Sequence, residues 1–304
     1  MIFLNAVGYI SLIALLALIG LTGFSEIMAI KGLNNEELMS VKYIDIDGEK
    51  IAYREAGIEN EKDLVLVHGF LGSSYDFSQI IPDLSRDYHV VATDLIPFGF
   101  SSKNTEISFS KESISEYLYK SLEEIGVDDY FLLGHSMGGE VAINLLLNHP
   151  EKVEKLILID SAGYNENNQT TPKNQYLASL YLKIGFQNYP LQNLLFNLAF
   201  YDTSVVSKED FQGSYYLVYN LPSEALYKFN LDDDGGEIKD KIKNIKVPTL
   251  IIWGENDEII PVEYAYQFNK DIKESELVII SECGHIPYVE KREETLQAIY
   301  EFLD

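Results

Sequence analysis

The sequence contains a single cysteine, Cys283, among 304 residues. One cysteine excludes a disulfide within the chain, so the fold must be stabilised by an apolar core. We interpret Cys283 as a small buried side chain, because no base of its own lies next to it to activate the thiol. The sequence also lacks the Cys and His clusters that hold a structural metal, and it has no internal repeat.

Basic residues are scarce, with 23 Lys and Arg against 48 Asp and Glu and a formal net charge of −25. A surface of this charge repels polyphosphates and anionic membranes, and no run of Lys or Arg provides a local exception. The sequence therefore predicts no nucleic-acid partner and favours a neutral or cationic ligand. The apolar fraction of 46% and the charged fraction of 23% are typical of a folded globular chain.

The N-terminal segment lacks acidic and basic side chains from residue 2 to residue 25, and residues 10–21 are almost wholly apolar. A helix rises ~1.5 Å per residue, so such a stretch is long enough to cross a hydrocarbon layer of ~30 Å. We predict that residues 1–30 form a single membrane anchor, because the Lys or Arg that opens most signal peptides is missing. A cleaved signal that exports the protein and a helix buried against the domain are the alternatives.

Residues 41–161 and 247–304 alternate strand-like and helix-like segments. Apolar and polar side chains alternate on both sides of Asp47-Gly48, in residues 41–47 and 50–56, which predicts an antiparallel hairpin. Helical periodicity is clear further along the chain, for example in residues 111–125 and 293–303. Short apolar runs typical of parallel strands buried on both faces occur at residues 64–67, 89–93, 130–133, 156–159, 249–253 and 277–280. The pattern predicts an α/β fold with a doubly wound, mostly parallel sheet.

Residues 162–246 interrupt this alternation with a stretch rich in Tyr, Phe, Leu and Asn. Helices are expected at residues 174–184 and 191–199, and an acidic turn that contains glycine at residues 232–237. We predict a helical lid, because the insertion falls where a cover over the carboxyl ends of the strands would lie. The alternative is that these helices are ordinary core layers whose aromatic side chains only pack.

The segment Gly134-His135-Ser136-Met137-Gly138-Gly139 lies where an apolar run gives way to a helical pattern. Glycines two positions before and after Ser136 remove Cβ atoms that would clash in a sharp turn from strand to helix. Such a turn exposes the serine hydroxyl above the edge of the sheet. We interpret Ser136 as a catalytic nucleophile; the alternative is a serine in an ordinary turn flanked by glycines.

A serine nucleophile needs a base, and the base needs an acceptor for the proton on its other ring nitrogen. His285 and Asp257 each follow a strand-like run, so both side chains are expected just past the carboxyl ends of strands. The chain order Ser136, Asp257, His285 is that of the nucleophile-elbow fold. Asp160, which also ends a strand-like run, is the alternative acid. Three other histidines are interpreted as structural: His89, His135 and His149.

The negative charge on a tetrahedral intermediate needs hydrogen-bond donors. One candidate is the backbone N–H of Met137, the residue after Ser136. The other is the N–H of Phe70 in the loop His68-Gly69-Phe70-Leu71-Gly72, whose glycines let the backbone approach a substrate closely. This chemistry predicts neither a cofactor nor a metal ion.

On these residues the chain resembles the α/β-hydrolase fold superfamily over about residues 41–304. Phe98 stands where the family pattern has a glycine, which we expect to alter the shape of the cleft without removing a catalytic group. Haloalkane dehalogenases and epoxide hydrolases of similar fold use an aspartate where Ser136 stands, so the resemblance disfavours both activities. The motifs that carry the resemblance are His68-Gly69-Phe70, Asp94 to Ser101, Gly134 to Gly139, Gly254 to Asp257 and Gly284-His285.

Three functions remain open from the sequence. The first is a serine hydrolase that cleaves an ester of a largely apolar, small or lipid-like molecule through an acyl-enzyme at Ser136. The second is a carbon–carbon bond hydrolase similar to those that act on meta-cleavage products, whose anionic substrates favour an arginine clamp. Of the three arginines, Arg54, Arg86 and Arg292, none lies in the predicted lid. The third is a binding domain without catalysis, tethered to a membrane.

Overall fold

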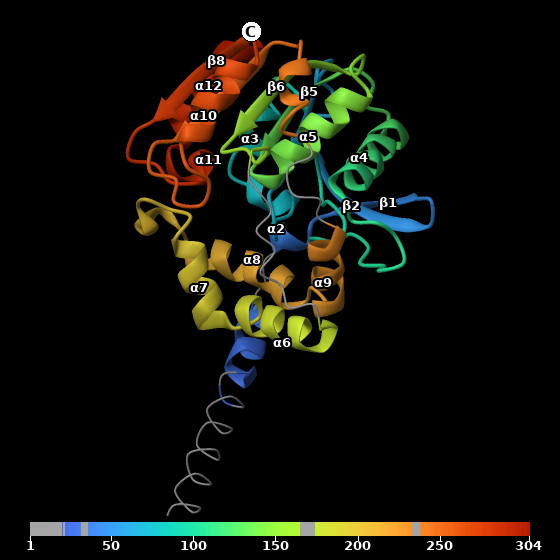
Figure 1. Ribbon diagram of the computed structural model, residues 1–304, viewed down its shortest axis with the longest axis vertical. Helices are drawn as coiled ribbons and strands as arrows, with labels where there is room; N and C mark the ends of the chain where they lie inside the picture. Colours follow the sequence, from blue (N-terminus) through green and yellow to red (C-terminus); the bar gives the residue numbers. More distant parts are fainter. Residues whose placement is uncertain (1–19, 21, 32–35, 165–173, 233–237) are drawn as a thin grey trace, which may run out of the picture.

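The computed structural model describes residues 20, 22–31, 36–164, 174–232 and 238–304. Its centre is an eight-stranded sheet with helices on both faces (Figure 1). The strands follow the order β1-β2-β4-β3-β5-β6-β7-β8, and all pairs from β4 to β8 are parallel. This confirms the predicted α/β fold with a mostly parallel sheet. The strands are β1 Lys42–Ile46, β2 Glu49–Ala56, β3 Asp63–Val67, β4 His89–Thr93, β5 Tyr130–His135, β6 Val153–Ile159, β7 Thr249–Gly254 and β8 Ser275–Ile280.

The predicted hairpin is confirmed as the antiparallel pair β1 and β2. Its turn consists of Asp47 with φ of 56° and Gly48 with φ of 85°. Two successive residues in the left-handed region give the turn the twist that neighbouring strands require, and Asp-Gly adopts this geometry readily. β2 then pairs antiparallel with β4, which joins the hairpin to the parallel sheet.

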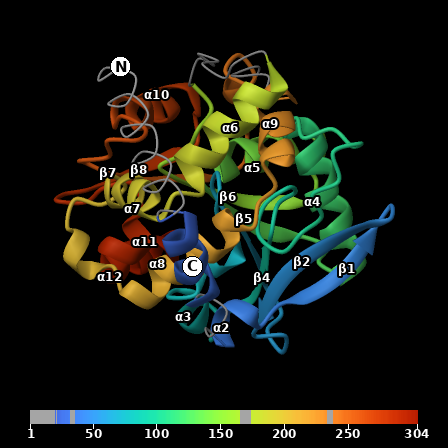
Figure 2. The ribbon, with the colours of Figure 1, turned by 90° about the horizontal axis from the view of Figure 1, so that it is seen from below.

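Two apolar cores lie on opposite faces of the sheet (Figure 2). On one face, the strands pack against α4, α5 and α10; on the other, they pack against α3, α11 and α12. β5 and β7 are buried along their whole length because both of their faces are covered, which is why they are continuous apolar runs in the sequence. The helices are α3 Ile81–Leu84, α4 Lys111–Ile125, α5 Met137–Asn148, α10 Glu263–Asp271, α11 Pro287–Glu290 and α12 Arg292–Leu303.

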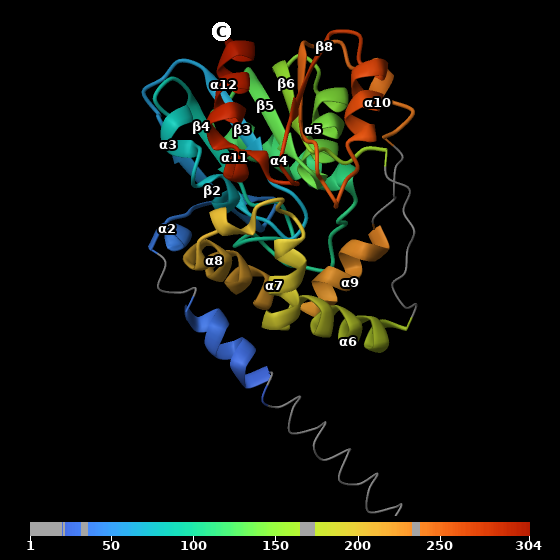
Figure 3. The same ribbon diagram turned by 90° about the vertical axis from the view of Figure 1, so that its left-hand side faces the viewer.

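Four further helices lie between β6 and β7 in the chain and gather at one end of the molecule (Figure 3). They are α6 Gln175–Phe186, α7 Tyr189–Asn197, α8 Lys208–Tyr219 and α9 Ser223–Asp232. α6 and α7 confirm the two helices expected here, whereas α8 and α9 were not predicted. The acidic turn expected at residues 232–237 falls outside the described residues after Asp232. Shorter elements are α2 Glu36–Met39 and the 3₁₀ turns Ser74–Phe77, Thr203–Val205 and Ile242–Asn244.

Residues 22–31 are helical and pack against α7 and α8. The Phe24 ring contacts that of Tyr189 at 5.5 Å between centroids, and the Tyr189 N–H donates to Ser25 Oγ at 3.1 Å. Met28 shares a small apolar cluster with Tyr215. Within the described residues, no helix combines the length and the apolar character that a membrane span needs. The predicted anchor rests mainly on residues 1–19 and 21, which lie outside the described residues, so it stays a prediction.

Candidate active site

Ser136 occupies a strained turn between β5 and α5. Its φ of 55° and ψ of −126° are sparsely populated for a residue with a side chain and persist only where the surroundings enforce them. Here the enforcement is close packing: a Cβ on Gly138 would lie 2.2 Å from the Val67 carbonyl oxygen, and one on Gly134 would lie 2.6 Å from the Gly138 oxygen. These approaches are the physical reason for the glycine spacing in the sequence.

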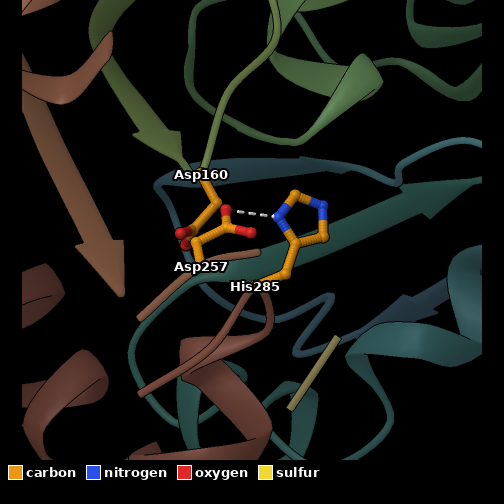
Figure 4. A group of neighbouring side chains, drawn as sticks. All are labelled: Asp160, Asp257 and His285. Atoms are coloured by element: carbon orange, nitrogen blue, oxygen red, sulfur yellow. Dashed lines mark hydrogen bonds and ion pairs between the residues drawn. The ribbon is translucent and has the colours of Figure 1, made fainter. Parts of the chain in front are cut away.

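Asp257 and His285 are joined by a hydrogen bond of 2.7 Å between Oδ2 and Nδ1 (Figure 4). The other oxygen of Asp257 accepts hydrogen bonds from the N–H groups of Ile259 at 2.7 Å and Ile260 at 3.0 Å. This carboxylate is therefore fixed from two sides, and it orients the imidazole through Nδ1. Nε2 is then the nitrogen of His285 that is available to accept a proton.

Asp160, the alternative acid, lies beside Asp257 rather than in hydrogen-bond contact with His285 (Figure 4). Its Oδ1 accepts a hydrogen bond from the Gly254 N–H at 3.0 Å, and its backbone has a positive φ of 43°. Burial raises the pKa of Asp160 well above the ordinary value for an aspartate, and the neighbouring charge of Asp257 raises it further. Both effects favour the protonated form of Asp160, which can donate its proton in a hydrogen bond to the Asp257 carboxylate.

The same three side chains have the atom types of a metal site, with candidate ligand atoms of Asp160, Asp257 and His285 within 4.8 Å of one another. Two features favour hydrogen bonding instead. The distance of 2.7 Å from His285 Nδ1 to Asp257 Oδ2 is that of a charge-assisted hydrogen bond. Burial also raises the pKa of Asp160, which favours the protonated carboxyl over the deprotonated form that metal ligation requires.

The loop that carries His285 is held by residues to which the sequence analysis gave no role at the site. His135 is buried and its Nε2 lies 2.8 Å from the His285 carbonyl oxygen. Glu290 accepts hydrogen bonds from the N–H groups of Gly284 and Asp202, and the His285 N–H donates to the Ala199 oxygen at 2.7 Å. The loop is thus bonded to β5, to α11 and to the chain that follows α7. A histidine next to the elbow serine is the one sequence signal that could have indicated this arrangement.

The loop after β3 approaches Ser136 closely. A Cβ on Gly69 would lie 3.0 Å from Ser136 Cβ and 3.4 Å from Ser136 Oγ. The buried His68 holds the loop in place: its Nδ1 lies 2.7 Å from the Gly69 oxygen, and its Nε2 accepts the Leu95 N–H at 2.8 Å. Burial lowers the pKa of His68, which keeps the ring in the neutral form that this pair of contacts needs. The structure thus brings the Phe70 backbone next to the turn that contains Ser136.

Met137 is the first residue of α5, so the helix offers its N–H no carbonyl partner. It adjoins Ser136, as the sequence analysis expects for an oxyanion donor. The Phe70 ring packs against Phe98 at 5.6 Å, Phe186 at 6.0 Å and Phe229 at 5.5 Å between centroids. Phe98, the departure from the family pattern, is therefore a buried side chain that packs against the ring of the loop residue Phe70.

Ser136 and His285 line one cavity of about 280 Å³. In the described part of the chain, Ser136 Oγ makes no hydrogen bond to His285, a contact that in enzymes often tightens only when substrate binds. The cavity walls come from the loops after β3 and β8 and from α6, α7 and α8. Side chains that line it are mainly apolar and include Phe70, Phe186, Leu195, Phe196, Phe200, Val206, Val218 and Ile259.

Two carboxyl groups, those of Asp76 and Asp210, also line the cavity, and none of its described lining residues is Lys or Arg. Burial raises the pKa of Asp76 to about 7. An anionic ligand would therefore meet negative potential without a compensating cation, whereas a neutral ligand would not.

The remaining candidates lie away from this cavity. His89 is paired with Asp63 and Glu55, and His149 is stacked on Tyr119 at 3.6 Å, as expected for structural histidines. Cys283 is fully buried, and burial raises the pKa of its thiol, which removes the thiolate that a nucleophile needs. Of the candidates considered, Ser136 is thus the nucleophilic side chain that lines the same cavity as a histidine, His285.

A family model described as alpha/beta hydrolase fold matches residues 63–292. These residues are most of the chain, and the chain therefore belongs to the alpha/beta hydrolase fold family. The match includes the elbow, both acids and His285.

Similarities to individual proteins agree with the assignment to this family. Uncharacterized hydrolase YugF of Bacillus subtilis (strain 168) is 28% identical over 277 residues, covering 88% of this chain and 99% of that protein. Lipase 1 of Psychrobacter immobilis is 28% identical over 284 residues, covering 86% of this chain and 83% of the lipase. The solved structure of a membrane phospholipase A is 28% identical, with a TM-score of 0.75 and coverage of 98% of this chain and 97% of the other. The chain is a hydrolase of the α/β fold.

Proposed function

We propose that this protein is a serine hydrolase that cleaves neutral, largely apolar carboxylic esters through an acyl-enzyme at Ser136. The observation that carries the proposal is the hydrogen bond of 2.7 Å between Asp257 and His285, on a histidine that shares an apolar cavity with Ser136. A base with its tautomer fixed, next to a serine on a strained turn, is the arrangement that acyl transfer needs.

In the acylation step, Ser136 Oγ attacks the ester carbonyl carbon while His285 Nε2 takes the hydroxyl proton. The carbonyl π electrons move to the oxygen, and the N–H groups of Met137 and Phe70 stabilise the resulting oxyanion. When the intermediate collapses, the bond to the alkoxy oxygen breaks and His285 gives its proton to the departing alcohol. Asp257 remains ionised and stabilises the imidazolium.

In the deacylation step, His285 takes a proton from water as the water oxygen attacks the acyl carbon. A second oxyanion forms in the same position, and its collapse breaks the bond to Ser136 Oγ, which regains a proton from His285. The products are a carboxylic acid and an alcohol, and the enzyme returns to its starting state.

The wall of the cavity supports a neutral and apolar substrate. Apolar side chains dominate it, with Asp76 and Asp210 as carboxyl groups and no described Lys or Arg. Burying an acyl chain against such a wall contributes about 0.8 kcal/mol for each CH₂ group. Similarity to a lipase and to a membrane phospholipase A supports the same substrate class.

The carbon–carbon bond hydrolase is the weaker alternative. Its substrates are anions, and the described lining residues provide no cation to bind a carboxylate. A binding domain without catalysis is weaker still, because it would not need the strained backbone of Ser136 or the bonded pair behind it.

The test compares wild type, Ser136→Ala and the control Ser281→Ala on p-nitrophenyl esters of increasing acyl length. Ser281 is exposed and follows β8, outside the cavity. We expect kcat/KM to rise with acyl length in the wild type and in Ser281→Ala, and to fall by at least ~10³-fold in Ser136→Ala. Turnover of a meta-cleavage dienoate but of no ester would overturn the proposal, as would an active Ser136→Ala variant.

A further inference from the structure

Helix α6 is apolar on all sides, although only one side packs on the protein. Ala178 and Leu182 are buried. The opposite side exposes a set of large apolar side chains at helical spacing: Tyr176, Leu177, Leu180, Tyr181 and Ile184, between 45% and 77% exposed. A helix that is apolar all round normally lies in a core or in a membrane, whereas a solvated face carries charge. The exposed face of α6 therefore lacks its cover.

Two neighbouring helices continue this apolar surface. α7 exposes Leu194, and Leu198, directly after the helix, is exposed too. Residues 22–31 bury Ser25 and Met28 against α7 and α8, while Phe24, Ile27 and Ile30, three positions apart, stay exposed. Figures 1 and 3 show α6, α7 and residues 22–31 together at the end of the molecule away from the sheet. We call the exposed apolar residues of these three helices the apolar end.

The charge distribution sets this end apart from the rest of the chain. Residues 174–201, which contain α6 and α7, have no aspartate or glutamate and a single lysine, Lys183, although the chain has 48 acidic residues among 304. Residues 2–25 have no acidic or basic side chain either. Within the described residues, 22–25 of the second stretch contact Tyr189 of the first, so parts of two stretches without carboxylates meet in a protein whose net charge is −25.

We propose that the apolar end lies on the surface of a lipid bilayer and sinks its exposed Leu, Ile and Tyr side chains into the boundary between headgroups and acyl chains. The described structure begins at this same end, within the uncharged residues 2–25, which as a helix are long enough to cross a hydrocarbon layer of ~30 Å. A bilayer would account both for the exposed apolar residues and for the uncharged N-terminal residues. A second copy of the chain would account for the exposed apolar residues alone.

Charge is scarce at this end, with Lys183 on α6 and Glu26 and Lys31 in residues 22–31, and this scarcity also specifies the lipid. Helices that bind anionic membranes have Lys and Arg on their polar face, and α6 offers Lys183 alone. An overall charge of −25 would in addition repel an anionic surface. The surface therefore suits zwitterionic lipid, where apolar burial supplies the binding free energy.

The cavity reaches the apolar end. Leu195 of α7 both lines the cavity with Ser136 and is 37% exposed, and Phe186 at the end of α6 lines the cavity too. An ester drawn from the bilayer could thus pass between these side chains to Ser136. This last point rests on the proposed function, whereas contact with the bilayer does not.

Tryptophan fluorescence tests the contact directly. The one tryptophan of the chain, Trp253, is fully buried, so a new tryptophan at the surface dominates quenching by brominated lipid. Tyr181→Trp places the reporter on α6, and Tyr266→Trp places a matched control on α10; the two tyrosines are 56% and 55% exposed. Full-length protein is reconstituted in vesicles of phosphatidylcholine, half of it brominated near the headgroup.

We expect brominated lipid to quench about half of the added emission of Tyr181→Trp and little of that of Tyr266→Trp. Equal quenching of the two variants, or none at residue 181, would overturn the proposal. If Tyr181→Glu turned a dimer into a monomer while quenching was absent, the cover would be a second copy. Circular dichroism checks that each variant is folded, and failure of the folded proteins to hydrolyse a soluble short-chain ester would count against the proposed function alone.

Discussion

The edge of the sheet and the apolar end differ in how their side chains are held in place. At the sheet edge, Ser136, Asp257 and His285 are 8%, 8% and 6% exposed, and backbone contacts fix each of them. At the apolar end, the side chains of α6 such as Tyr176 and Leu177 are more than half exposed. The side chains of the proposed reaction are therefore held within the chain, whereas we propose that the apolar end is covered from outside.

The two regions meet at one place. The His285 N–H donates to the Ala199 oxygen just after α7, and a Cβ on Gly284 would lie 2.5 Å from that same oxygen. A change in the position of α7 would therefore move the loop that carries His285. This contact couples the surface that we assign to lipid with the base of the proposed reaction.

The largest effect is expected from Asp257→Asn at the sheet edge. The amide cannot stabilise an imidazolium and favours the wrong tautomer of His285, so we expect kcat to fall by about 10⁴-fold. Steady-state kinetics on a p-nitrophenyl ester, with circular dichroism as a check on folding, measures the change. The control Glu255→Gln alters an exposed residue of the same loop and should leave kcat within about twofold. A similar loss in both variants would contradict the assigned role.

Gly138→Ala and Gly185→Ala compare the two regions with the same added methyl group. At Gly138 the Cβ would meet backbone oxygens of Val67 and His68 at 2.2 and 2.4 Å, which cannot move aside. We expect this variant to lose ~1–3 kcal/mol of unfolding free energy and at least ~10-fold in kcat. At Gly185, in α6, nothing lies within 4 Å, and the alanine should add ~0.5–1 kcal/mol. Denaturant unfolding measures both, and equal losses would refute the comparison.

Substitutions at Asp160 should lower kcat less than Asp257→Asn does, because Asp160 acts through Asp257. Asp160→Asn keeps an acceptor for the Gly254 N–H and a donor toward Asp257, so we expect kcat to stay within about threefold. Asp160→Ala removes both, and we expect ~10-fold lower kcat with KM unchanged. A merely structural role would instead lower stability in both variants and leave kcat of the folded protein alone.

The raised pKa of Asp160 also predicts a pH dependence of stability. Because the folded state holds this proton more tightly than the unfolded chain, its contribution is fully present below the ordinary aspartate pKa and is lost as pH rises toward the folded-state pKa. Asp160→Asn should therefore reduce the decline in unfolding free energy between pH 5 and pH 8, by up to ~1.4 kcal/mol per pH unit. An unchanged decline would mean that Asp160 is not protonated.

Much of the sheet and the positions of the candidate site residues follow from local patterns. Buried parallel strands are continuous apolar runs, and the glycines around Ser136 reflect close contacts that only glycine permits. Placing Asp257 and His285 just past strand ends was enough to expect them together, because those ends meet at one edge.

Other features depend on contacts between distant segments and have no local signal. The contact of His135 with the His285 loop spans 150 residues and that of Glu290 with Asp202 spans 88, and only the folded chain shows that Asp257, not Asp160, bonds to His285. α8 and α9 were missed; in the folded chain α8 packs on residues 22–31, and α9 packs on α6 and on the core of one sheet face. Sequence periodicity could not predict which face of α6 is exposed, because apolar side chains occur on both sides of the helix.

Intact-protein mass spectrometry after treatment with a fluorophosphonate tests Ser136 most directly, because the reagent reacts with serines that an adjacent base activates. We predict a single adduct on the wild type, mapped by peptide digestion to Ser136, and none on Ser136→Ala at equal time and concentration. An adduct at another residue, equal labelling of both proteins, or an unlabelled wild type that is folded by circular dichroism would contradict the proposed acyl-enzyme.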